Sequence, residues 1–196
     1  MHSLVQWMNF MKDLNTVSEK LISLAIECGA TRASVIDASL IKTDKIFREM
    51  CAANSCGMYG KCWTCPPDVG EISELMEKLS HYTYALVYQT VSPLEDSFDF
   101  ESMVLAKKNF RSLSLSLRPK IDAELSQKTL HLGAGGCGVC EVCAKRDGEP
   151  CRFPDLAMAS LEAYGVNVSE LAKSAGMKYI NGVNTVTYFG AVLFDL

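Results

Sequence analysis

The stretch that decides the fold is YALVYQTV, residues 84–91, near the middle of the 196-residue chain. Its β-branched and aromatic side chains form a short, nearly continuous apolar run, which is typical of a buried strand. A helical pattern, ISELMEKLSHY at residues 72–82, precedes this strand, and an acidic turn, SPLEDSFDFE at residues 92–101, follows it. Residues 72–101 are therefore predicted to form a helix, a strand and a turn, in that order.

The alternation of helix and strand continues outward to both ends of the chain. We therefore expect a mixed α/β or α+β fold around a central sheet of about four or five strands. Pro119 should kink or break the longest helix, and Asn181-Gly182 is a turn candidate in the C-terminal tail. The expected helices are 14–28, 44–54, 102–127, 154–165 and 169–176, and the expected strands are 33–41, 129–132 and one or two within 177–196.

The composition is that of a globular protein, with 48% hydrophobic and 21% charged residues. A net charge of −4 argues against nucleic acid or an acidic membrane as partner, since both bind basic surfaces. No run of about 18 apolar residues predicts a membrane span, and residues 1–14 lack the basic segment and cleavage site of an export signal. We expect one cytoplasmic domain over residues 1–196, with two cysteine-rich loops at 51–67 and 133–154.

Nine cysteines are many for a cytoplasmic chain, and they favour metal binding over a disulfide framework. Their number is odd, no export signal accompanies them, and several stand two residues apart, a spacing typical of ligands. Eight fall into two motifs, C-x4-C-x5-C-x2-C and C-x2-C-x2-C-x7-C, whereas Cys28 lies on the apolar face of a helix. The candidate metal ligands are Cys51, Cys56, Cys62 and Cys65 in the first motif, and Cys137, Cys140, Cys143 and Cys151 in the second.

The second motif favours a 4Fe–4S cluster over zinc. Its three closely spaced thiols can reach separate irons of a cubane as the loop wraps around it, whereas a zinc site usually joins two C-x2-C pairs across a longer span. Gly135, Gly136 and Gly138 allow the backbone to approach the cluster and to aim N–H groups at its sulfides. A phosphate cradle is the competing interpretation of these glycines. The first motif could hold a second cubane or zinc, or could complete the other cluster.

Other side chains near the motifs carry weaker signals. His131 precedes the glycine loop and is either a ligand or an ordinary packed residue. Tyr59 and Trp63 flank the first motif and could shield a cluster from water, which would tune its potential. Charged residues of the second motif could dock a redox partner through rim charges, or they could simply be solvated: Lys145, Arg146, Asp147 and Arg152.

The chain resembles a family of predicted metal-binding proteins found mainly in anaerobic bacteria and archaea. YGKCWTCPP, residues 59–67, and GGCGVCEVCAKRDGEPCRFPDLAMASLEAYGVNV, residues 135–168, carry the resemblance, which spans most of the chain. It implies iron–sulfur binding without a settled reaction. Seven of the eight candidate ligands match the cysteines of the family, whereas Cys62 stands where relatives often have Ser or Thr. The first site would then have one thiol fewer, or an open iron that can bind substrate as a Lewis acid.

These observations lead to three hypotheses. The first is an iron–sulfur protein, with one or two 4Fe–4S clusters, that transfers single electrons to a redox partner protein. The second is a redox enzyme or activator with an open metal site, for which the resemblance suggests a corrinoid or methyl-transfer context. The third is a zinc-stabilised structural or interaction module. A homo-oligomer is compatible with all three.

Overall fold

The protein is built around a five-stranded mixed sheet with the strand order β1-β2-β5-β3-β4. The computed structural model describes residues 2–125 and 127–196, with side chains from residue 13 onward. Neighbouring strands are antiparallel except β3 and β4, which run parallel. The strands are β1 (Arg32–Asp37), β2 (Tyr84–Pro93), β3 (Leu130–Gly133), β4 (Ala159–Ser160) and β5 (Thr185–Phe194). The expected fold class and number of strands are confirmed.

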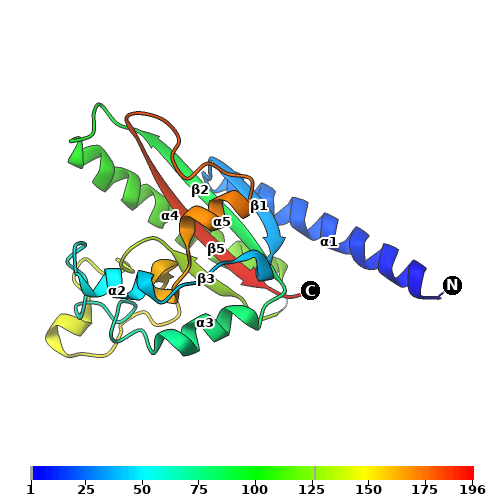
Figure 1. Cartoon of the computed structure of the whole chain (residues 1–196), viewed down its shortest axis with the longest axis horizontal. Coiled ribbons are helices and arrows are strands. Elements are labelled where there is room, and N and C mark those ends of the chain that lie inside the picture. The colour runs from blue at the N-terminus through cyan, green and yellow to red at the C-terminus, as the bar shows by residue number, and fades with distance from the viewer. Residues whose placement is uncertain (1, 126) are drawn as a thin grey trace.

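The long pair β2–β5 forms the centre of the sheet (Figure 1). Their register runs from Tyr84 opposite Phe194 to Pro93 opposite Thr185. The C-terminal tail is thus one strand of 10 residues. Asn181-Gly182 does not form a hairpin between two strands, because it precedes β5, which pairs along its whole length with β2 and at residues 191–193 with β3.

One face of the sheet is covered by the two longest helices, α1 (His2–Glu27) and α4 (Phe100–Glu124). Leu86 and Tyr88 of β2 point to this face and pack with Leu21 of α1 and Leu117 of α4. Each of these side chains is at most 1% exposed. Burying one leucine of this kind stabilises the fold by about 1.5–3 kcal/mol, so the face is held mainly by apolar contacts.

Pro119 lies inside α4 and does not end it. A proline in a helix removes one backbone hydrogen bond and clashes with the preceding turn. Leu117 and Ile121, on either side of it, are both completely buried against the sheet. Packing of these neighbours offsets the local cost, so the helix continues to Glu124.

The opposite face of the sheet is covered by shorter elements, α3 (Ile72–Ser80) and α5 (Val168–Ser174) (Figure 1). Ala85 and Val87 of β2 point to this face because side chains alternate along a strand. Residues 154–165 were expected to form a helix and do not. They form β4 and the 3-10 helix η3 (Glu162–Tyr164), since β4 pairs with β3 beside the sheet.

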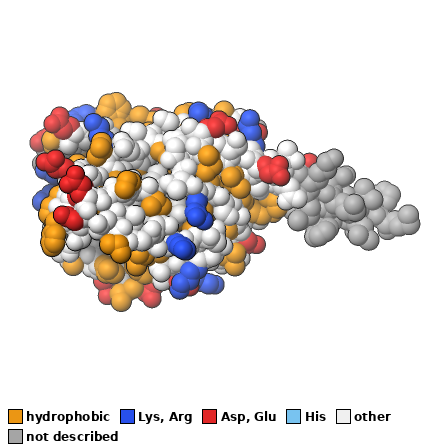
Figure 2. All heavy atoms as spheres, turned by 90° about the horizontal axis from the view of Figure 1, so that it is seen from above, with side chains coloured by type: hydrophobic (Ala, Val, Ile, Leu, Met, Phe, Trp, Pro, Cys, Tyr) orange, Lys and Arg blue, Asp and Glu red, His pale blue; other side chains and the backbone are white. Residues whose placement is uncertain are grey.

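The remaining short helices are α2 (Ile46–Ala52), η1 (Ala38–Leu40) and η2 (Ala144–Asp147). In the described part of the chain, no helix combines the length and the apolar character needed to cross a membrane. Figure 2 shows one face of the surface, on which acidic side chains gather at the end of the molecule away from the grey atoms.

Candidate metal centre

The glycine loop that follows β3 passes between α4 and the first cysteine motif. A Cβ on Gly138 would lie 2.1 Å from the guanidinium carbon of Arg111 in α4. A Cβ on Gly136 would instead meet Met58, and would stand 3.7 Å from Sγ of Cys65. Gly138 also has a φ of +61°, a conformation that side chains rarely adopt. The positive φ therefore favours glycine at position 138, and side chains at positions 136 and 138 would also displace Met58 and Arg111.

All four thiols of the second motif line one small cavity of about 20 Å³. Cys62 and Trp63 of the first motif line the same cavity. The chain thus brings together cysteines that are far apart in the sequence. Apart from Cys62, the lining thiols are Cys137, Cys140, Cys143 and Cys151, each partly exposed.

The first motif is held in place by backbone contacts on the short-helix face of the sheet. Asp44 N–H donates to the carbonyl of Gly165 at 2.7 Å, and Thr43 forms a β-bridge with Val166. These contacts hold α2, which carries Cys51, against η3, which carries Glu162. Burial raises the pKa of the Cys51 thiol, and the Glu162 carboxylate and the Cys56 sulfur raise it further.

Cys62 and Cys65 are the two buried thiols of the first motif, 1% and 8% exposed. Cys65 N–H donates to the carbonyl of Cys62 at 2.9 Å, which forms a tight turn. A hydrogen bond from the Cys65 thiol lowers the pKa of Cys62, and the same bond raises the pKa of Cys65. The shared hydrogen bond therefore favours the proton on Cys65 and the thiolate form, which binds metal, on Cys62.

Backbone groups and Thr64 form further hydrogen bonds to the sulfur atoms of Cys62 and Cys137. The hydroxyl of Thr64 lies 3.4 Å from Sγ of Cys62, and the backbone of Cys137 also hydrogen-bonds that sulfur. Burial raises the pKa of Cys137, while backbone hydrogen bonds from Val139 and Met158 oppose that shift. Hydrogen bonds of this kind are the interactions that tune metal-bound thiolates.

The two cysteine motifs are also joined by side chains outside the thiols. Trp63 Nε1–H donates to the carbonyl of Glu149 at 2.9 Å. Lys145 Nζ lies 4.3 Å from the centre of the Trp63 ring and forms an ion pair with Asp68. The ammonium group of Lys145 thus contacts Trp63 and Asp68 within the protein. Arg152 donates to the carbonyl of Val142 at 3.1 Å, lies 4.0 Å from the Asp147 carboxylate and is half exposed.

His131 packs against α4 and hydrogen-bonds to side chains outside the cysteine motifs. Its Nε2 lies 2.9 Å from Oδ1 of Asp122 in α4, and 3.1 Å from the hydroxyl of Thr129. Burial lowers the pKa of His131, and Asp122 only partly opposes this. The arrangement matches the ordinary packed histidine that was one of the two sequence interpretations.

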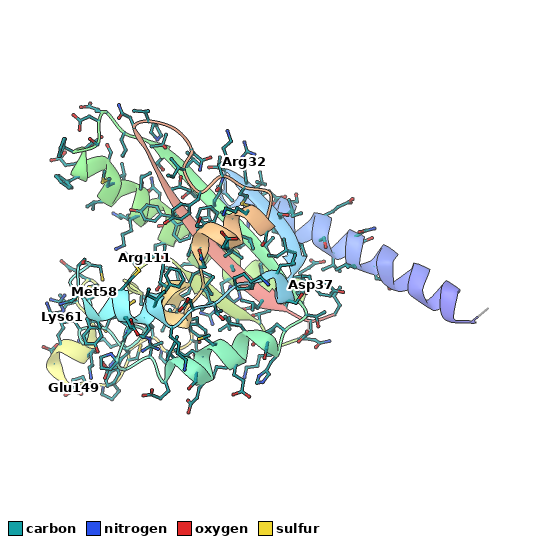
Figure 3. All side chains as sticks on the ribbon, in the orientation of Figure 1. Arg32, Asp37, Met58, Lys61, Arg111 and Glu149 are labelled. Carbon is teal, nitrogen blue, oxygen red and sulfur yellow. The ribbon has the colours of Figure 1, made fainter. Side chains whose placement is uncertain are left out.

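The sequence patterns did not identify two basic residues that lie at the glycine loop. Lys107 and Arg111 stand one turn apart on α4, and Lys107 Nζ would lie 3.0 Å from a Cβ on Gly135. In Figure 3, Arg111 lies at the end of the molecule that also carries Met58, Lys61 and Glu149. A lysine and an arginine four apart on a helix usually indicate a solvated face, so only the fold identifies this pair.

Thiolates bind single metal ions as well as clusters. Among residues with described side chains, no three His, Cys, Asp or Glu residues are grouped as they would be around a single ion. The ligands of a cubane bind separate irons and surround a volume, as the thiols do around this cavity. The donor chemistry, the cavity and the hydrogen bonds to sulfur are thus all compatible with a cluster.

Comparisons with known proteins agree with a metal site but do not identify the metal. No curated protein and no solved structure matches the chain. A family model described as "Predicted metal-binding protein (DUF2284)" matches residues 34–194, which include both cysteine motifs. The chain therefore belongs to this family of predicted metal-binding proteins.

Proposed function

We propose that this protein binds 4Fe–4S clusters and transfers single electrons to a partner protein. The observation that carries the proposal is the cavity into which the whole second motif gathers, with Cys62 beside it. Cys137, Cys140, Cys143 and Cys151 would each hold one iron of a cubane there. The cluster supplies the one-electron chemistry, and the protein sets its potential through charge, hydrogen bonds and exposure.

The surroundings of the cavity would favour the reduced, more negative state of a cluster. Arg111 contributes a positive charge next to Gly138, and its guanidinium is always protonated. Positive charge and backbone N–H groups stabilise added electrons, because they lower the energy of the reduced form. Trp63 lines the cavity and separates part of it from water.

The first motif would hold a second cluster through Cys51, Cys56, Cys65 and Cys62. Cys62 is buried between the two motifs, and hydrogen bonds from Cys65 and Thr64 lower its pKa, which favours the thiolate form that binds metal. A second candidate function follows from the same residue. If Cys62 does not bind the metal of the first motif, that motif keeps three thiols. One iron of its cluster would then lack a protein ligand and could bind substrate. The protein would then be an enzyme or activator.

Iron and acid-labile sulfide analysis of anaerobically purified protein tests the proposal. Each occupied cubane adds about four irons and four sulfides per chain, and the protein should be brown and bleach with dithionite. Cys140→Ala should lose the iron of the second motif, whereas Cys28→Ser, outside both motifs, should keep all of it. A colourless protein with stoichiometric zinc would instead support the structural module.

The redox partner should be recognised through charge. The chain carries a net charge of −4, and acidic side chains gather at one end of the face shown in Figure 2. Rim charges of this kind mainly raise the rate of association and make it sensitive to salt. Electron transfer to a basic partner should therefore slow as ionic strength rises.

A further inference from the structure

A second cavity, separate from the one lined by the thiols, lies beside the glycine loop. Its volume is about 240 Å³, a little below the range of about 300–1,000 Å³ for drug-sized ligands, so it suits a smaller molecule. It is bounded by Gly135 of the loop, by β5 and by the residues before α5. The side chains that matter to the argument are Lys107, Glu162, Tyr179, Thr187 and Phe189.

Two oppositely charged side chains line this cavity without an ion-pair partner among the described side chains, although the Glu162 carboxylate also acts electrostatically on Cys51. Lys107 and Glu162 are both half-buried. Neither makes an ion pair or a side-chain hydrogen bond with any residue whose side chain is described. A partly buried charge has lost water without a compensating contact. A ligand that brings the matching charges would supply those contacts.

The wall of the cavity is aromatic and fixed in position. Tyr179 stacks on Phe189, with ring centres 6.1 Å apart and planes 21° from parallel. Phe189 is buried in the core, whereas Tyr179 is half exposed. Asn181 ties the segment that carries Tyr179 to β5, since its side-chain amide donates to Thr187 at 3.0 Å. An apolar or aromatic body could therefore rest against a pre-formed surface.

We propose that this cavity binds a small zwitterion of the amino-acid class, with its carboxylate at Lys107, its ammonium at Glu162 and its apolar body against Tyr179. Gly135 leaves room for the Lys107 ammonium, because a Cβ there would lie 3.0 Å from Nζ. The assignment does not depend on which metal the cysteines hold. It adds a small-molecule site to a protein whose proposed function is electron transfer.

The test uses the full chain, purified anaerobically, and calorimetric titration with three probes. Phenylalanine carries both charges, phenylpropionate only the carboxylate, and phenylethylamine only the ammonium. Phenylalanine should bind at least about tenfold more tightly than either analogue, since each charge-assisted contact contributes about that much. If phenylalanine does not bind, or binds no better than both analogues, the assignment is wrong.

Two substitutions test the contributions of Lys107 and Glu162 one at a time. Lys107→Met should weaken phenylalanine and phenylpropionate by about tenfold and leave phenylethylamine unchanged. Glu162→Gln should weaken phenylalanine and phenylethylamine and leave phenylpropionate unchanged. Lys108→Met and Glu101→Gln, both exposed on α4, are the matched controls. Equal effects of the test and control variants would overturn the proposal. Iron content, measured on each variant, shows separately whether the metal sites are affected.

Discussion

Trp63 Nε1–H donates a hydrogen bond of 2.9 Å to the carbonyl oxygen of Glu149, 86 residues away. This bond joins the two cysteine motifs directly, and Lys145 covers the same indole ring at 4.3 Å. The two motifs therefore form one structural unit. Loosening this contact should affect both.

Trp63→Phe should lower the free energy of unfolding by about 1 kcal/mol, because it removes one hydrogen bond and keeps an aromatic ring. Hydrogen exchange of residues 148–151 should become faster. Trp63→Ala should cost more, since the contact with Lys145 is also lost. Unchanged denaturation and exchange in Trp63→Phe would show that the bond does not couple the motifs.

Gly138→Ala should be somewhat more damaging than Gly148→Ala, because the Arg111 guanidinium would have to move. Both glycines have positive φ, +61° and +74°, so both alanines cost about 1–2 kcal/mol of backbone strain. A Cβ at Gly138 also collides with Arg111, while one at Gly148 has nothing within 4 Å. Chemical denaturation and iron content would measure the difference. Adding Arg111→Ala should recover part of the loss in Gly138→Ala, and an equal loss in both glycine variants would contradict this account.

Gln89→Leu should stabilise the protein. The side chain of Gln89 is completely buried in β2, and neither its amide nitrogen nor its oxygen has a hydrogen-bond partner among the residues whose side chains are described. An unpaired buried amide costs about 1–3 kcal/mol, which an apolar residue of similar size avoids. A rise in melting temperature would confirm the gain, and Gln89→Glu should lower it. A destabilised Gln89→Leu would reveal a hydrogen bond to a bound water.

Stability should fall as the pH drops from about 7 towards 5, because of His131. Burial lowers its pKa in the folded state, so below its ordinary pKa the unfolded chain takes up a proton that the folded chain does not. Stability decreases down to the folded pKa and is then constant. The charged groups beside the ring are Asp122 and Arg118, and Asp122 has a lowered pKa and stays ionised in this range.

His131→Gln should flatten that dependence over the same pH range. Urea denaturation at several pH values measures it, with His81→Gln as control, since His81 is an exposed residue at the end of α3. If both variants keep the slope of the parent protein, the protonation of His131 is not its origin.

Cys62→Ser should reduce bound iron, because we propose that its buried thiolate is a ligand. Serine is of similar size but binds iron poorly compared with thiolate. Iron and sulfide analysis against Cys28→Ser would measure the loss. Full retention of iron in Cys62→Ser would favour the second candidate, in which the first motif has an open iron.

Much of the fold could be predicted from local patterns. Residues 84–91 lie within β2, and the helix expected at 72–82 is α3. The expected helix at 154–165 was wrong, because β4 at Ala159–Ser160 pairs with β3 and replaces helical hydrogen bonds. Short segments have weak local preference, so their partners in the sheet decide their structure.

The sequence by itself determined that eight thiols lie in two glycine-rich motifs and that strands alternate with helices. Both follow from residue types and spacing, which are local properties. Only the tertiary structure decided that Cys62 shares a cavity with the second motif, and that Lys107 and Arg111 reach the glycine loop. These contacts join residues far apart in the chain, and packing on the two faces of the sheet brings them together.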